Sequence, residues 1–175
     1  MSTEHPILAP GVAEGPEFTH VRTMFDGDRA TAEIGATITA LDVGTCEGHF
    51  TIRPEMCNGH GTAQGGYLYM FADSIFAGAC NSGGDLAVAA HNSIHYIAPA
   101  FEGDVVDGVG ITRQTWGRNG VVDVTLSIKG NPIAEFRGTF RVLPAKPQNR
   151  KKITRSHRAR SERAEIGRRS QTRLT

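Results

Sequence analysis

The chain has 175 residues, a net charge of +1, 39% hydrophobic and 21% charged residues. This length and hydrophobic content predict one domain with its own core, and without a run of 18 apolar residues no membrane-spanning helix is predicted. The charge is uneven, because residues 146–175 carry 11 of the 19 Lys and Arg residues and leave the rest of the chain acidic. Such high charge with few apolar residues predicts a disordered basic tail. Phosphates attract such basic runs, so the alternative is a polyanion or a membrane surface as partner of the tail, but without interleaved aromatic residues we expect no nucleic-acid partner.

Cysteine and histidine spacing gives no sign of a disulfide framework or a metal site. The chain has three cysteines, Cys46, Cys57 and Cys80, an odd number with no paired spacing. The N-terminus lacks the basic region followed by an apolar one that marks a secretory signal, so we expect reduced thiols in the cytoplasm. Cys57 has no local His partner and is interpreted as a small structural residue. His91 and His95 lie four positions apart without an evident third ligand, so no metal is predicted.

The first third of the chain contains a leader, a short helix and two strands. Residues 1–18 are rich in Pro and Gly and predict an irregular leader, followed by a short helix over about 19–30. Apolar residues alternate with small and polar ones from Glu33 to Val43, which predicts a strand. A second predicted strand covers about His49–Arg53.

Residues 65–80 form one long predicted helix. Leu68, Phe71, Ile75 and Ala79 recur at spacings of three and four, and further apolar residues fill the other sides. A helix that is apolar almost all round is buried in the core.

Four more strands are predicted after this helix. Two cover Leu86–Ile97 and Val105–Thr115, and two alternating segments follow turns predicted at Asn119-Gly120 and Gly130-Asn131. The apolar face of such a sheet must be covered, and the long helix is the candidate. The sequence therefore predicts an α+β hotdog fold over residues 19–145, with an antiparallel sheet wrapped around one central helix.

Asp73 is unusual because it lies on this apolar helix. No cation lies three or four residues away, so desolvation is expected to raise the pKa of the carboxyl, as at many functional sites. The alternative is a structural carboxylate that bonds a neighbouring backbone group or pairs with a distant residue such as Arg118 or Arg137.

Gly65 and Gly66 begin the helix, where backbone N–H groups lack intrahelical partners. Such donors suit the oxyanion of a thioester cleavage, although the two glycines alone also fit a tight turn. Gly66 and Asp73 share one face but lie roughly 10 Å apart along the axis, too far to hold one carbonyl. A symmetric dimer would supply the glycines from one subunit and the carboxylate from the other.

Two side chains in the loop before the helix are further candidates. The Asn58 amide has the groups to hold a water or the acid, or to form an ordinary Asn-Gly turn. His60 lies between two glycines and ranks below Asp73 as a base.

These motifs resemble a known family. Asn58-Gly-His-Gly, Gln64-Gly65-Gly66 and the helix sequence from Ala72 to Ser82 resemble the PaaI-type hotdog thioesterases of phenylacetate metabolism. The resemblance covers roughly residues 20–143 and includes Tyr96–Pro99, Gly103-Asp104, Gly117–Gly120 and Ala134–Gly138.

The resemblance implies hydrolysis of an aryl-acyl (phenylacetyl-like) or other acyl-CoA, with no metal and no cofactor beyond the CoA of the substrate. It implies a homodimer or a dimer-of-dimers tetramer with sites between subunits. Asp73 would be the nucleophile or general base, Gly66 would polarise the carbonyl, and Asn58 would assist near the attacking water.

One position departs from the family pattern. Gln64 stands where the family usually has His, and Gln keeps hydrogen-bonding groups but cannot titrate near neutral pH. Two alternatives follow: a non-catalytic acyl-CoA-binding module, which Gln64 and the basic tail favour, and a hotdog dehydratase or hydratase, which the missing His disfavours.

Further residues are candidates for contact with the acyl group or CoA. The predicted contacts are Arg118, Gly120, Ser74 and Tyr67. The aromatic residues that would either line an aryl pocket or belong to the core are Tyr67, Phe71, Phe76 and Trp116.

Overall fold

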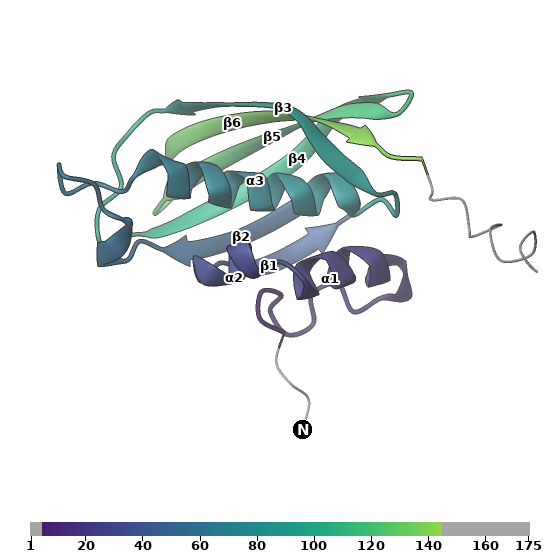
Figure 1. The fold of residues 1–175 in the computed structure, drawn as a ribbon, viewed down its shortest axis with the longest axis horizontal. Coiled ribbons are helices and arrows are strands. Elements are labelled where there is room, and N and C mark those ends of the chain that lie inside the picture. The colour runs from purple at the N-terminus through teal and green to yellow at the C-terminus, as the bar shows by residue number, and fades with distance from the viewer. Residues whose placement is uncertain (1–4, 145–175) are drawn as a thin grey trace, which may run out of the picture. The chain divides into compact units, whose positions relative to one another are not determined.

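The computed structural model describes residues 5–144, so the predicted tail at 146–175 lies outside the described residues. Six antiparallel strands form one sheet in the order β1-β2-β4-β5-β6-β3, and the long helix α3 (Gly65–Asn81) lies across one face of it (Figure 1). Helix α3 contacts all six strands. The strands are β1 (Thr37–Asp42), β2 (Thr45–Thr51), β3 (Ala87–Tyr96), β4 (Val105–Trp116), β5 (Asn119–Ile128) and β6 (Asn131–Val142).

This arrangement confirms the predicted α+β hotdog architecture, with two strands, one long helix and four strands in chain order. The expected helix over 19–30 is two helices, α1 (Thr19–Asp26) and α2 (Arg29–Glu33), separated at Gly27 and Asp28. Asp28 caps α2, because its Oδ1 accepts a hydrogen bond from the Thr31 N–H at 3.0 Å. Short 3-10 turns cover Pro16–Phe18 and Pro54–Met56. Because α2 ends at Glu33, the strand that was expected to begin there begins at Thr37.

The hairpin turn predicted at Asn119-Gly120 was wrong by two residues. Trp116 pairs with Asn119, so Gly117 and Arg118 form the turn, and Gly117 has a φ of +56°. Gly120 is buried in β5, where a Cβ atom would overlap the Phe140 ring. The glycine of the Asn-Gly pair is thus required by close packing.

The turn predicted at Gly130-Asn131 was wrong by one residue. Ile128 pairs with Asn131, and the turn consists of Lys129 and Gly130, with φ values of 51° and 79°. Two positive φ angles in a two-residue hairpin match the right-handed twist of the flanking strands.

Close contact between α3 and the sheet depends on small residues in β4. A Cβ atom at Gly108 would lie 2.8 Å from the Phe71 ring, and one at Gly110 would lie 2.8 Å from Ile75 Cγ2. These two glycines leave the space that the two α3 side chains fill. Both side chains, like Phe76, are fully buried core residues.

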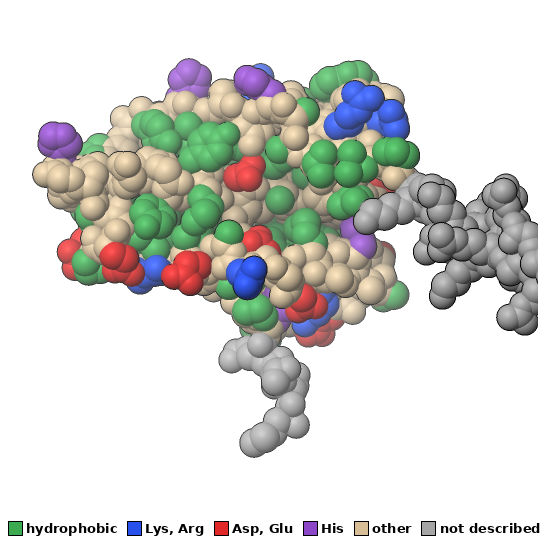
Figure 2. Space-filling model, viewed as in Figure 1, with side chains coloured by type: hydrophobic (Ala, Val, Ile, Leu, Met, Phe, Trp, Pro, Cys, Tyr) green, Lys and Arg blue, Asp and Glu red, His purple; other side chains and the backbone are tan. Residues whose placement is uncertain are grey.

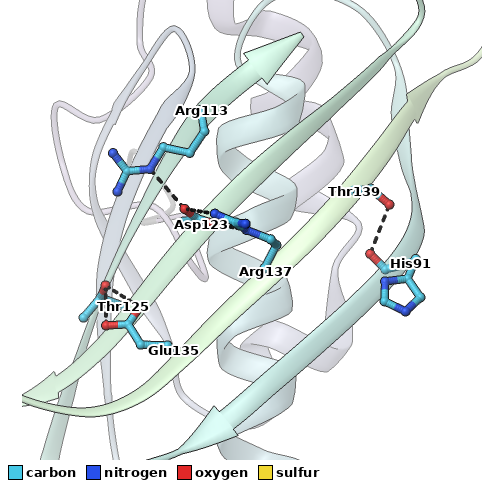
Figure 3. A network of polar contacts seen from close by, with 7 residues as sticks. All are labelled: His91, Arg113, Asp123, Thr125, Glu135, Arg137 and Thr139. Carbon is cyan, nitrogen blue, oxygen red and sulfur yellow. Dashed lines mark hydrogen bonds and ion pairs between the residues drawn. The ribbon is translucent and has the colours of Figure 1, made fainter. Parts of the chain in front are cut away.

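The opposite face of the sheet carries polar side chains (Figure 3). Arg137 on β6 donates from Nε and Nη2 to the Asp123 carboxylate on β5 at 2.6 and 2.8 Å, and Arg113 Nε on β4 lies 3.2 Å from it. The hydrogen bond from Arg137 is the main cause of the lowered pKa of Asp123. Arg137 is therefore occupied on the face away from α3.

Part of the leader packs into the fold. Ile7 and Leu8 are buried, and Leu8 forms a parallel bridge with Ile38 on β1. Within residues 5–144, no helix combines the length and apolar character needed to cross a membrane.

Candidate active site

The Asp73 carboxylate lies at the middle of α3, where the helix faces β3. Its Oδ1 accepts a hydrogen bond of 2.8 Å from Asn92 Nδ2. Desolvation by burial raises the pKa of Asp73, the hydrogen bond from Asn92 opposes that effect, and the nearby charge of Asp28 adds to it. No Lys or Arg among the described residues forms an ion pair with Asp73, so the alternative of a partner at Arg118 or Arg137 finds no support in this structure.

The first turn of α3 presents unoccupied backbone donors. Neither the Gly65 N–H nor the Gly66 N–H donates to a group within residues 5–144, whereas the Gln64 and Tyr67 N–H groups donate to Met56 O and Gln64 O. Gly66 is exposed, and a Cβ atom there would meet nothing within 4 Å. The side-chain position of Gly66 therefore faces open space at the first turn of α3.

Gly65 is held from the other side by Tyr96 at the end of β3. The Tyr96 hydroxyl donates to Gly65 O at 2.8 Å, and a Cβ atom at Gly65 would lie 3.0 Å from the tyrosine ring. Both residues line a groove of about 500 Å³ between the start of α3 and residues 96–100. Apolar side chains of this groove therefore lie next to the free N–H groups at the start of α3.

The Asn58 side chain is occupied within its own loop. Its Oδ1 accepts from the His60 N–H at 2.9 Å, and its Nδ2 donates to Thr62 Oγ1 at 3.0 Å. This pattern is a side-chain-stabilised turn. In the single protomer the Asn-Gly turn is therefore the observed role of Asn58, and its part in catalysis stays a prediction. His60 is exposed in the same loop.

The other predicted contact residues do not gather around Asp73. Ser74 is buried and donates to Met70 O at 3.0 Å, while its hydroxyl lies 2.7 Å from Thr31 Oγ1, so it ties α3 to α2. Tyr67 is half-buried beside the core, and Gln64 is exposed at the N-cap of α3 without a side-chain capping bond.

Arg118 lies near the opposite end of α3. Together with Cys80 and Gly83 it lines a pocket of about 300 Å³ beside the β4–β5 turn. Gly66 and Cys80 are 14 positions apart in one helix, roughly 20 Å along its axis, so one protomer does not bring Arg118 to the glycines. Gly120 is a packing residue in β5. Of the candidate aryl-pocket residues, Phe71 and Phe76 belong to the core and Trp116 is exposed.

Burial disfavours two of the three cysteine thiols as nucleophiles. Burial raises the pKa of Cys80 to about 12, and burial also raises the pKa of Cys46. Cys57 is half-buried, with its thiol 3.8 Å from Arg53 O. The described residues contain no group of three or more His, Cys, Asp or Glu side chains arranged to hold a metal ion.

Two residues of the site were missed from the sequence. Asn92 and Tyr96 reach α3 from β3, across separations of 19 and 31 residues. No local motif links such distant positions. The available signal was a polar side chain within an alternating strand predicted to border the helix.

The fold, the half-buried carboxylate at the middle of α3 and the free N–H groups at its start indicate the class of protein, and comparisons with known proteins agree. The thioesterase superfamily model matches residues 60–134. The chain belongs to this superfamily, since it also aligns with acyl-coenzyme A thioesterase PaaI of Escherichia coli strain K12. That alignment is 32% identical over 120 residues and covers 68% of this chain and 86% of the relative.

The structures most similar to this chain include two PaaI proteins. The E. coli PaaI protein from the phenylacetic acid degradation operon superposes with a TM-score of 0.71 at 30% identity, covering 74% of this chain and 95% of that one. A mutant of the phenylacetic acid degradation protein PaaI of Thermus thermophilus gives 0.65 at 31% identity, covering 66% and 100%. The predicted resemblance to PaaI-type hotdog thioesterases is confirmed.

Proposed function

We propose that the protein hydrolyses an acyl-CoA thioester, with Asp73 as general base or nucleophile. The observation that carries the proposal is a desolvated carboxylate on the same helix as two free N–H groups at Gly65 and Gly66. Membership of the thioesterase superfamily and similarity to the E. coli acyl-CoA thioesterase support the same reaction.

In the general-base form of the reaction, Asp73 takes a proton from water as the water oxygen bonds to the acyl carbon. The carbonyl oxygen becomes an oxyanion, which the Gly66 N–H of a second subunit stabilises at the positive end of its helix dipole. The intermediate collapses, the carbon–sulfur bond breaks, and CoA leaves as a thiolate that takes up the proton. Raising the pKa of the base toward the working pH strengthens it as a proton acceptor. The proposal uses water and protein groups only, with no cofactor beyond the CoA of the substrate.

We propose that the site is completed in a homodimer formed at the β3 edge. Strand β3 pairs only with β6 among the described strands, so its other edge carries unpaired backbone groups. Leu86, Val88, Tyr96 and Ile97, on or beside β3, are exposed by 56%, 42%, 52% and 58%. Figure 2 shows hydrophobic side chains gathered on the face where α3 and β3 lie. Pairing two such edges around a twofold axis would bring Gly66 of one subunit toward Asp73 of the other.

A tetramer built from two dimers is a further proposal. Val105, Val109 and Ile111 lie on the outer face of β4 with Asp107 between the first two, and the three apolar residues are exposed by 46%, 39% and 37%. This apolar row on the second face of the sheet supports an additional contact between dimers.

The acyl group is proposed to be aryl-acyl, such as phenylacetyl, because the groove beside Gly65 includes Tyr96 and the apolar side chains of Leu68 and Ile97. Gln64 stands where the family usually has His and cannot titrate near neutral pH, so the proposal assigns the acid–base role to Asp73. This assignment makes the reaction more dependent on the ionisation of one carboxyl than in a His-containing relative.

The test is a hydrolysis screen over aryl-, short- and medium-chain acyl-CoAs with detection of the released thiol. Asp73→Asn is expected to lower kcat by at least about 10²-fold while the fold is retained. Glu33→Gln, which neutralises an exposed carboxylate at the end of α2 and outside the proposed contacts, is the matched control. Full activity of Asp73→Asn would refute the assignment, and tight acyl-CoA binding without turnover by the wild type would favour the non-catalytic alternative.

The shared site has a separate test. Asp73→Asn and a Gly66→Pro variant, which lacks the N–H donor, are mixed and allowed to exchange subunits. A mixed dimer would regain one intact site, so partial recovery of activity is expected. Two inactive variants that exchange subunits without recovery would exclude a site between subunits.

A further inference from the structure

We propose that Asn92 is the positioning residue of Asp73, holding the carboxylate in its ionised, base-competent state through a single side-chain hydrogen bond. The proposal rests on the proposed thioesterase function and assigns a role to a residue outside the glycine and aspartate motifs.

The contact joins two different elements at the centre of the site. Asn92 on β3 donates from Nδ2 to Asp73 Oδ1 on α3 at 2.8 Å. No other side chain among residues 5–144 donates to this carboxylate. A hydrogen bond to an ionised oxygen is short and directional, so this one contact defines where the carboxylate oxygens lie.

Asn92 lies opposite a glycine that leaves room for its amide group. Its register partner on β6 is Gly138, where a Cβ atom would lie 2.8 Å from Asn92 Oδ1 and 2.6 Å from the Phe76 ring. The glycine thus leaves the space in which the amide oxygen sits. That oxygen is buried and accepts no hydrogen bond from the described residues.

An amide has a donating and an accepting side. If the amide of Asn92 were reversed, two acceptor oxygens would face each other unless Asp73 carried a proton. The observed orientation leaves Oδ1 without a partner and directs Nδ2 to the carboxylate. It therefore favours the ionised form of Asp73, at the expense of a buried acceptor.

The other groups around Asp73 act in the opposite direction or lie too far away. Burial and the charge of Asp28 at the N-cap of α2 raise the pKa of Asp73, whereas the hydrogen bond from Asn92 lowers it. On α3 itself, burial raises the pKa of Cys80, and the charge of Asp73 adds to that effect. Because side chains alternate along a strand, His91 and His95 lie on the face of β3 away from α3. Arg137 and Asp123 lie on that same outer face of the sheet.

The experiment compares the pH dependence of kcat for the wild type, Asn92→Leu and Asn92→Asp. Leucine keeps the approximate volume and removes the donor, and aspartate keeps the shape and adds a like charge. In both variants the acidic limb of the profile is expected to move to higher pH, further for Asn92→Asp. At neutral pH, kcat is expected to fall about tenfold with KM little changed, because a charge-assisted bond to the base is lost.

Ser93→Ala is the matched control, since Ser93 is the next residue on β3 and is exposed on the other face. Profiles of the Asn92 variants that match the wild type, or that move equally in Ser93→Ala, would overturn the proposal. Thermal unfolding and sedimentation are the controls that each variant is folded and associated like the wild type. If Asn92→Leu does not fold, the comparison of Asn92→Asp with the wild type still tests the proposal.

Failure of the proposed function would be recognised separately. If the wild type hydrolyses no acyl-CoA, the Asp73 carboxyl is titrated by carbon-13 NMR in the wild type and Asn92→Leu. A higher titration midpoint in the variant supports the role of Asn92 even then, and an unchanged midpoint refutes it.

Discussion

The peptide unit between Gly65 and Gly66 offers a sharp test of how this site stabilises charge. Its carbonyl oxygen accepts the Tyr96 hydroxyl at 2.8 Å, and its N–H is the free donor of Gly66. Both groups belong to one amide, so a hydrogen bond to the oxygen polarises the whole unit and makes the N–H a stronger donor. Partial desolvation raises the pKa of Tyr96, so its hydroxyl stays protonated and continues to donate.

Tyr96→Phe removes this hydrogen bond and keeps the ring against Gly65. One oxyanion-hole donor contributes about 3–4 kcal/mol, and cooperative polarisation strengthens a bond by roughly 10–30%. The expected loss is therefore about 0.3–1 kcal/mol of transition-state stabilisation, which lowers kcat by roughly two- to fivefold. Because Tyr96 is 52% exposed, the loss of global stability should stay below about 1 kcal/mol.

The assay is steady-state hydrolysis with thiol detection, at a pH well above the midpoint of the acidic limb so that Asp73 is ionised in both proteins. Thermal unfolding serves as the control for folding. A kcat equal to that of the wild type would refute the polarisation argument. A change confined to KM would instead place the Tyr96 hydroxyl in substrate binding.

Two other outcomes follow from the same contacts. Ser74→Ala should destabilise the fold by about 1 kcal/mol without raising KM, because its buried hydroxyl bonds Met70 and Thr31; a higher KM with unchanged thermal stability would show that Ser74 contacts substrate. Since desolvation raises the pKa of Asp73 in the folded state, the folded protein holds that proton more tightly than the unfolded chain, and stability falls as pH rises through the raised pKa. Asp73→Asn should therefore raise Tm at neutral pH. The gain in Tm should become smaller as the pH is lowered toward the ordinary pKa of a carboxyl, and a gain that grows on acidification would contradict this sign.

The helix and its reactive residues were predictable because their signals are local. Apolar spacing of three and four residues defined α3 almost to its ends, and the two glycines and Asp73 lie within that one segment. The alternation of β5 and β6 was equally clear, since one face of each strand is buried.

Signals that depend on distant packing were not predictable in the same way. An Asn-Gly pair predicts a turn from backbone preference alone. Here Gly120 lies inside β5, because the Phe140 ring packs where a side chain at position 120 would be. Likewise, Asn92 gains its role only when β3 meets α3, beside a glycine 46 positions further along the chain. The short α2 was missed because tertiary contacts with α3, and a cap from Asp28, stabilise five residues that have weak helical periodicity.

The bridge between the leader and β1 has a consequence for assembly. Ile38 donates to Ile7 O at 2.8 Å and accepts from the Ala9 N–H at 2.9 Å, so the leader covers part of the outer edge of β1. Within residues 5–144, β3 then keeps the more open edge of the sheet. Strand pairing that joins two such molecules at β3 leaves a covered edge at each end of the joined sheet, which opposes further growth into a fibre. In the proposed dimer, the leader would therefore oppose the addition of a third copy at the β1 edge.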